Sequence, residues 1–402
     1  MIPKQQRSSV STIERDSNEI EPKIIDIRRK IHSEPELSFK EFRTAELVAY
    51  ELRKIGIRVT THVGGNGVIG LLKGGLPGKV VALRADMDAL PVIEEVELPF
   101  KSKNKGVMHA CGHDTHVAML LGAAMLLSKH KNELCGTVKF LFQPAEEDGG
   151  IGGAKPMIEA GAMIKPKVDY VFGLHIWGEY PAKTFGIRAG PFMATPDGFK
   201  IKILGKGGHG SRPDQTVDPI FVSAQLINAL QAISSRMISP IRPFVLSVCS
   251  IHSGTKDNII PNEAMLEGTM RTLDQKTRSL AKKYMRQITN DTCRAYGAKY
   301  VLEFVKDPYP ITYNDEKATE RALKILKTIR GTKTMEIDVK LGAEDFARFL
   351  QKAPGVFYYI GTKNKKKGCT APNHSSKFKV DEDVLKYGAL SLATLALDFA
   401  KP

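Results

Sequence analysis

The chain has 402 residues, which exceeds the usual size of one domain and predicts two. Apolar residues make up 42% and charged residues 26%, as in ordinary globular proteins, and no apolar run is long enough for a transmembrane helix. The formal net charge of +15 is spread along the sequence without a zinc-finger spacing or an RNA-binding motif, so we expect a solvated basic surface and neither a nucleic-acid nor a membrane partner.

The N-terminal segment and the cysteines indicate the compartment. The first 20 residues lack the apolar segment of a secretory signal, and we expect them to form a poorly ordered tail. The five cysteines are scattered and include no CxxC pair, which favours reduced thiols and a cytoplasmic protein.

The first clear helix covers about 41–55. Ser38 and Glu41 have the spacing of a capping box at its start, and Gly56 follows its end. Beyond this helix, short and almost continuously apolar runs occur near 67–73, 79–88, 137–143 and 168–177. Helical stretches separate them, so we predict a mainly parallel sheet that is flanked by helices on both faces.

From about Gly190 the pattern changes. Strand-like runs and two long helices follow in the order β-α-β-β-α-β, which is that of the ferredoxin-like motif. After Asp307 the alternation of helices and strands resumes. We therefore predict an α/β catalytic domain made of residues 1–190 and 307–402, with a ferredoxin-like domain of residues 191–306 inserted into it.

Ionisable residues follow the apolar strands. One run delivers Asp86 and Asp88, the next leads to Glu146 and Glu147, and a third contains His175. Ligands bind at the carboxyl ends of the strands in an open parallel sheet, so we expect these groups at one edge. Carboxylates gathered there would repel one another unless cations lay among them.

Two further segments carry metal-ligand chemistry. Cys111 and His113 flank a glycine, which allows both side chains to turn toward one point, and His374 lies in a turn-rich segment late in the chain. Thiolate and imidazole suit zinc, nickel, cobalt or manganese better than calcium. Each feature alone is more simply a solvated Glu-Glu pair or a hydrogen-bonded core histidine, and only their combination favours a metal site.

That combination resembles a known family. The segments that carry the resemblance are, in chain order, MHACGHDTH, QPAEEDGGIGGA, FGLHIW, GKGGHGSRP, NIIPNEAMLEGTMR, GAEDFARF and PNHSSKF. They are similar to the amidohydrolase branch of the dinuclear metallopeptidases, which includes hippurate hydrolases, indole-acetyl-amino-acid hydrolases and N-acetyl-diaminopimelate deacetylases. The resemblance runs from about residue 25 to the C-terminus and implies a catalytic α/β domain with an inserted ferredoxin-like lid.

The resemblance also implies roles for individual residues. The implied ligands of two divalent cations per subunit are Cys111, His113, Glu147, His175 and His374. Glu146 would be the general base and acid, and His209 of the lid would steady the oxyanion, in related dimers from the neighbouring subunit. Asp88 would orient a ligand without binding metal. The lid residues Asn258 and Arg271 would hold the substrate carboxylate.

Two positions depart from the pattern of relatives. Asp86 stands where peptidase relatives carry a metal-binding histidine, for which Cys111 substitutes in this branch, so we leave Asp86 out of the metal set. Asp214 stands where many relatives have a histidine, so the details of substrate recognition stay open.

The predicted activity is metal-dependent hydrolysis of the amide bond of N-acyl amino acids. Manganese or zinc is the expected metal, with nickel and cobalt as alternatives. A dipeptidase or aminopeptidase with the same site, and a catalytically inactive metal-binding protein, are the alternative functions. A homodimer through the lid is expected, because the lid sheet has exposed edges. The sequence leaves the acyl group and the released amino acid open.

Overall fold

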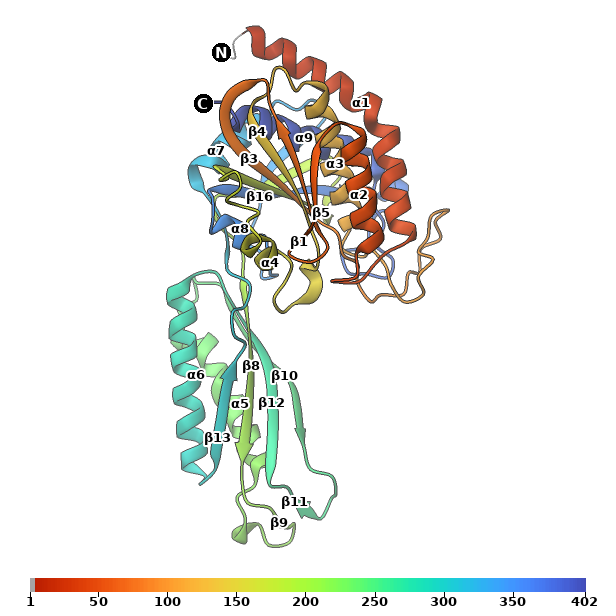
Figure 1. The fold of residues 1–402 in the computed structure, drawn as a ribbon. Helices are drawn as coiled ribbons and strands as arrows, with labels where there is room; N and C mark the ends of the chain where they lie inside the picture. Colours follow the sequence, from red (N-terminus) through yellow and green to blue (C-terminus); the bar gives the residue numbers. More distant parts are fainter. Residues whose placement is uncertain (1–3) are drawn as a thin grey trace. The chain divides into compact units, whose positions relative to one another are not determined.

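The computed structural model describes residues 4–402, with side chains from Thr12 onward. The chain divides into two compact units (Figure 1). Unit 1 comprises the residues up to Gly190 together with Thr312–Asp338 and Asp345–Pro402, and unit 2 comprises Pro191–Ile311 and Val339–Glu344. Unit 1 is therefore discontinuous in sequence.

Unit 1 is built on an eight-stranded sheet with the order β1-β2-β4-β3-β5-β16-β6-β15. Its strands are β1 Arg58–Val63, β2 Gly67–Lys73, β3 Leu76–Asp86, β4 Cys135–Gln143, β5 Tyr170–Pro181, β6 Thr184–Ile187, β15 Lys333–Glu336 and β16 Gly355–Lys363. The central strands β4, β3, β5 and β16 are parallel, whereas β1 and β2 are antiparallel to their neighbours. The predicted parallel core is thus confirmed. Two short strands, β7 Gly190–Met193 and β14 Thr312–Asn314, lie outside this sheet.

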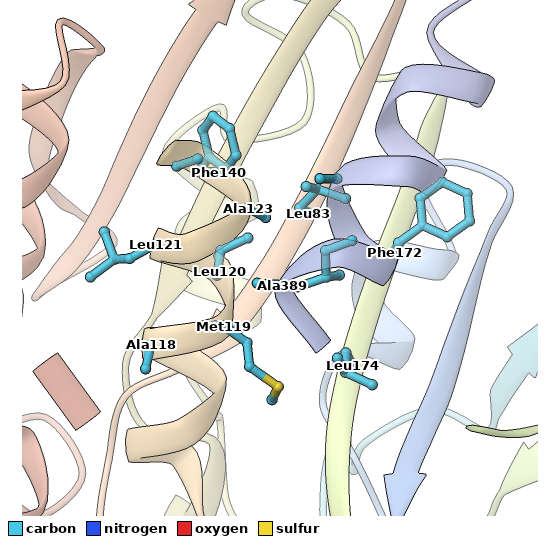
Figure 2. Packing of buried hydrophobic residues seen from close by; sticks show 14 of the residues in the cluster. Leu83, Ala118, Met119, Leu120, Leu121, Ala123, Phe140, Phe172, Leu174 and Ala389 are labelled. Atoms are coloured by element: carbon cyan, nitrogen blue, oxygen red, sulfur yellow. The ribbon is translucent and has the colours of Figure 1, made fainter. Parts of the chain in front are cut away.

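The helices of unit 1 are α1 Lys4–Ser33, α2 Phe42–Lys54, α3 His113–Lys129, α4 Ala154–Glu159, α7 Glu316–Leu326, α8 Ala347–Leu350 and α9 Leu385–Phe399. Figure 2 shows α3 beside α9, with Leu83, Phe172 and Leu174 of the sheet facing the two helices. A Cβ at Gly388 would come within 1.9 Å of Met119 Sδ, so any larger residue would require the side chain of Met119 to move. Within residues 4–402, no helix combines the length and the apolar character needed to cross a membrane.

The prediction of a poorly ordered N-terminal tail is wrong for residues 4–20. These residues belong to α1, which packs against α3 and α9. The buried apolar side chains Ile13, Ile24, Ile27 and Ile31 recur at helical spacing and supply the packing. Three of these four residues come after residue 20. The mostly polar composition of the first 20 residues therefore gave no sign of the apolar face.

Buried ionic contacts fasten α1 to the start of α3. Arg28 Nε donates to Asp114 Oδ2 at 2.7 Å, and His32 Nδ1 lies 2.9 Å from the same oxygen. His32 Nε2 in turn lies 3.0 Å from Glu94 Oε1. Burial opposes ionisation of Asp114, but Arg28 and His32 together outweigh it and hold the pKa of this carboxyl well below its usual range. Asp114 directly follows His113, so α1 secures the turn of α3 that carries a predicted ligand.

The predicted capping box at the start of α2 is also wrong. Glu41 occupies the N-cap position, but its side chain caps no amide of the helix. The hydroxyl of Ser38 donates instead to Asp88 Oδ2 at 2.7 Å. Both side chains point away from α2 because buried groups elsewhere in unit 1 need their hydrogen bonds.

Unit 2 contains a four-stranded antiparallel sheet with the order β10-β12-β8-β13. Its elements are β8 Thr195–Leu204, β9 Gly208–His209, α5 Pro219–Ala232, β10 Phe244–Ser253, β11 Ile259–Ile260, β12 Glu263–Thr272, α6 Gln275–Ala295 and β13 Lys299–Phe304. Asp218 and Asp274 cap the two helices by accepting hydrogen bonds from backbone amides. Strand order and connectivity are those of the ferredoxin-like motif.

Candidate metal centre

The ends of the parallel strands in unit 1 bring the predicted ligands together. Cys111 Sγ lies 3.3 Å from His175 Nε2 and 3.3 Å from His374 Nε2. Glu147 Oε1 lies 3.2 Å from His374 Nε2 and 3.9 Å from His113 Nε2. The ligand atoms form two groups that share Cys111: one with His113 and His175, the other with Glu147 and His374. Within each group the donor atoms lie within 4.8 Å of one another, so one cation could be coordinated by all three.

The turn that carries Cys111 and His113 requires a glycine between them. Gly112 has φ 91°, a left-handed conformation that L side chains rarely adopt. A Cβ at this position would also lie 2.2 Å from Ile176 Cδ1. Gly112 therefore allows the chain to turn tightly into α3 with both ligands on the same side.

Hydrogen bonds fix which ring nitrogen each buried histidine offers. His113 Nδ1 lies 3.1 Å from Asp88 Oδ1, and His175 Nδ1 lies 2.5 Å from the carbonyl oxygen of Ile176. Each ring therefore donates through Nδ1 and presents Nε2 as a lone pair. His113 Nε2 and Glu147 Oε1 are buried without a hydrogen-bond partner, as expected of atoms whose partner is a cation. The residues present thus fit a metal site.

The carboxylates of the cluster shift the pKa values of the neighbouring thiol and imidazole. Burial, with the nearby carboxylates of Glu147 and Glu146, raises the pKa of the Cys111 thiol well above its usual value. Burial opposes protonation of His113, but Asp86 and Asp88 outweigh it and raise its pKa to about 10. A bound cation would oppose both shifts, because it favours the thiolate and the neutral imidazole.

Glu146 lies beside this cluster. It is 8% exposed and begins a short 3-10 helix, Glu146–Asp148, that follows β4. Its carboxylate groups with the ligand atoms of His113 and Glu147, and Oε1 accepts a hydrogen bond of 3.4 Å from the amide of Asp345. Ala145, which precedes it, has φ 54°, so a strained residue sets the direction of Glu146.

The two aspartates after β3 have different partners. Asp88 accepts hydrogen bonds from His113 and from the amide of Glu147, at 2.9 Å, so it holds two predicted ligands. Asp86 contacts Arg84 Nη1 at 2.6 Å and His116 Nδ1 at 2.5 Å. The Nε2 atom of His116 accepts the amide proton of Ile176. Asp86 and His116 are thus engaged with protein groups, and together with His113 they also form a group of possible donor atoms.

Sequence reasoning missed one residue that joins three ligand-bearing segments. Asn373 Nδ2 donates to the carbonyl oxygens of Cys111 (2.9 Å) and Ile176 (3.4 Å), and its Oδ1 accepts from the amide of Gly178. The only signal in the sequence is its place next to His374.

The predicted residues of unit 2 lie at opposite ends of its sheet. His209 of β9 pairs with Ile259 of β11, and the amide of Gly210 donates to the carbonyl oxygen of Asn258, so His209 and Asn258 are neighbours. Arg271 lies near the other end of β12, opposite Pro196 of β8. The eight residue steps from Glu263 to Arg271 correspond to about 27 Å of strand. Figure 1 shows β9 and β11 beyond the end of β12 that is remote from Arg271.

Comparison with known proteins agrees with this geometry. The model of peptidase family M20/M25/M40 matches residues 82–398. Thermostable carboxypeptidase 2 of Saccharolobus solfataricus is 58% identical over 392 residues, which are 97% of this chain and 99% of that protein. N-acyl-L-amino acid amidohydrolase of Geobacillus stearothermophilus is 41% identical over 341 residues, 85% of this chain and 91% of that protein.

A solved structure agrees as well. The YXEP protein of Bacillus subtilis, described as a dinuclear metal binding peptidase of family M20, has a TM-score of 0.83 and 36% identity, and the match covers 95% of this chain and 98% of that one. The resemblance inferred from the motifs is confirmed. The chain is a hydrolase that belongs to peptidase family M20/M25/M40.

Proposed function

We propose that this protein hydrolyses the amide bond of N-acyl amino acids and releases a carboxylic acid and a free amino acid. The observation that carries the proposal is the cluster of Cys111, His113, Glu147, His175 and His374 with the carboxylate of Glu146 beside it. Relatives named N-acyl-L-amino acid amidohydrolase and N-acetylcysteine deacetylase support the N-acyl substrate class.

Peptides with a free C-terminal carboxylate form a second candidate substrate class. The 58% identity to thermostable carboxypeptidases 1 and 2 favours it. The chemistry is the same in both classes, because the scissile nitrogen belongs to an amino acid with a free carboxylate. The classes differ only in whether the acyl group is a simple acid or a peptide.

In the proposed reaction, the five ligands hold two divalent cations, with manganese or zinc as the expected metal and nickel or cobalt as alternatives. When bound, such ions polarise the amide carbonyl and lower the pKa of water toward neutrality. Glu146 accepts the proton of the attacking water and returns it to the departing amine. Asp88 keeps the geometry of the ligands His113 and Glu147 fixed while Glu146 exchanges protons.

Unit 2 supplies the proposed substrate contacts. His209 Nδ1 accepts the amide proton of Ser211 at 3.1 Å, which leaves Nε2 as the proton-bearing nitrogen of a neutral ring. That N–H is suited to an oxyanion. Arg271 offers a planar fork for the substrate carboxylate. Arg271 lies about 27 Å along β12 from Glu263, and His209 belongs to the separate β9–β11 pair beyond that end of the strand. Because the two residues are this far apart, we propose that a homodimer completes each site with His209 and Asn258 from the partner copy.

The dimer proposal predicts complementation between two damaged subunits. His209→Ala and Arg271→Ala should each lower turnover strongly as homodimers. A purified heterodimer of the two variants should regain about half of wild-type activity, because one of its two sites keeps both residues and the other has neither. Differently tagged, co-expressed subunits provide the heterodimer. Activity no higher than that of the parent variants, or a monomer in solution, would contradict the arrangement.

Amino-acid release from a substrate panel tests the function itself. The panel contains N-acetyl, N-benzoyl and indole-acetyl amino acids, N-blocked peptides with a free C-terminus, and unblocked dipeptides. Each is assayed with manganese, zinc, cobalt and nickel and with a chelator. Chelator-sensitive release from blocked substrates is expected. Release from unblocked dipeptides alone would identify the protein as a dipeptidase. If no substrate is hydrolysed although two metal ions are bound, the amidohydrolase assignment is wrong.

A further inference from the structure

Glu41 is a buried carboxylate that reaches the turn carrying Glu146. It has no exposed surface, and its Oε1 accepts hydrogen bonds of 2.8 Å from the amides of Phe39 and Ala145. Its Oε2 accepts from Asn66 Nδ2 at 3.1 Å. Glu41 and Ala145 are 104 residues apart in sequence, and Glu41 lies outside the residues 82–398 that match the family model.

The contact to Ala145 holds a strained part of the backbone. Ala145 has φ 54°, a left-handed conformation that is unfavourable for a residue with a Cβ. The turn is held from two sides: Glu41 accepts from the amide of Ala145, and the carbonyl oxygen of Ala145 accepts from the amide of Gly153 at 3.1 Å. Since Glu146 directly follows Ala145, the orientation of this peptide sets where the carboxylate of Glu146 points.

Neither helix capping nor ion pairing accounts for the burial of Glu41. It does not cap α2, and the described residues give it no cationic partner. Burial and the neighbouring charge of Asp88 raise its pKa to about 7, so the ionised carboxylate is less favourable at this position than in water. Groups kept at a cost in stability are expected near functional sites.

We propose that Glu41 is a positioning residue for the general base: through the amide of Ala145 it fixes the turn that aims Glu146 at the metal cluster. The proposal rests on the proposed role of Glu146. Ser38, three residues earlier, donates a hydrogen bond to Asp88, which orients the ligands His113 and Glu147. The segment of Ser38 and Glu41 therefore contacts both Asp88 and the turn that precedes Glu146.

Glu41→Ala in the full-length, metal-loaded enzyme tests this. We expect kcat to fall about 10- to 100-fold with a much smaller change in KM and an unchanged metal content. Hydrogen exchange at the amides of residues 144–148 should become faster. Glu41→Gln should retain most of the turnover and the protection, because its amide oxygen can still accept from Ala145. If the alanine variant does not fold, Glu41→Asp, which is too short to reach all its donors, should show the same pattern in weaker form.

Glu51→Ala is the matched control, because Glu51 is a 4% exposed carboxylate in α2, the helix that Glu41 precedes, and pairs with Lys23 at 2.8 Å. It should keep kcat within about twofold and leave exchange at 144–148 unchanged. Unchanged kcat or unchanged exchange in Glu41→Ala, or equal losses in Glu51→Ala, would overturn the proposal. Failure of the wild-type enzyme on every substrate would refute the proposed function, whereas the exchange experiment still decides whether Glu41 holds the turn.

Discussion

Glu146→Gln is expected to remove nearly all turnover while the protein keeps its bound metal. Glutamine has almost the same shape but cannot accept the proton of the attacking water. Loss of a positioned general base typically lowers the rate about 10²- to 10⁴-fold, and we expect kcat to fall within this range. The measurement is kcat on the best substrate of the panel, with metal content determined on the same sample.

Asp148→Asn provides the control for this substitution. Asp148 lies in the same short 3-10 helix, is exposed, and accepts amide protons from Gly150 and Ile151 through one oxygen, a contact that asparagine can keep. This variant should retain wild-type turnover. Substantial activity in Glu146→Gln would show that another group carries the proton, and loss of metal in that variant would place Glu146 among the ligands.

Cys111→Ala is expected to disrupt metal binding at both positions. Cys111 Sγ is the atom that the two ligand groups share, at 3.3 Å from both His175 Nε2 and His374 Nε2. Loss of a residue that only supports a ligand typically costs about 10- to 100-fold in metal affinity, and loss of the shared ligand should cost at least as much. Competition with a chelator, followed by measurement of bound metal, gives the affinities without reference to turnover.

Cys369→Ala is the corresponding control, because Cys369 is another buried free thiol of unit 1 that belongs to neither ligand group. Its substitution should leave both affinities unchanged. If Cys111→Ala binds both metals as tightly as the wild-type chain, the thiol is not a ligand and the site must be reassigned to the remaining donors.

The parts of this molecule that could be predicted are those set by local pattern. Continuous apolar runs predicted the parallel strands β3, β4 and β5, since such strands are buried on both faces. Asp218 and Asp274 cap α5 and α6 with their own side chains, so the signal for these helix starts is local in the sequence. Among the candidate ligands, Glu147 follows β4, and Cys111 and His113 flank Gly112, which turns the chain. His374 has no such local signal, and its role is implied only by the resemblance to the family.

The missed features depend on contacts between distant segments. The spacing of Ser38 and Glu41 fits a capping box, but Asp88 and Ala145 compete for these side chains and lie 50 and 104 residues away. Likewise, the docking of α1 depends on Arg28 meeting Asp114, 86 residues later. Local spacing carries no information on such partners, because the fold alone brings them together.

The discontinuity of unit 1 determines the order in which a growing chain can be completed. Chains are made from the N-terminus, and compact units fold as they emerge. β16 lies between β5 and β6, and α9 packs on α3, yet both are synthesised after Ile311, when all four strands of the unit 2 sheet already exist. Until then β5 has an open edge and His374 is missing. The metal cluster is therefore among the last parts to form, and a chain that ends early has an exposed strand and an incomplete set of ligands.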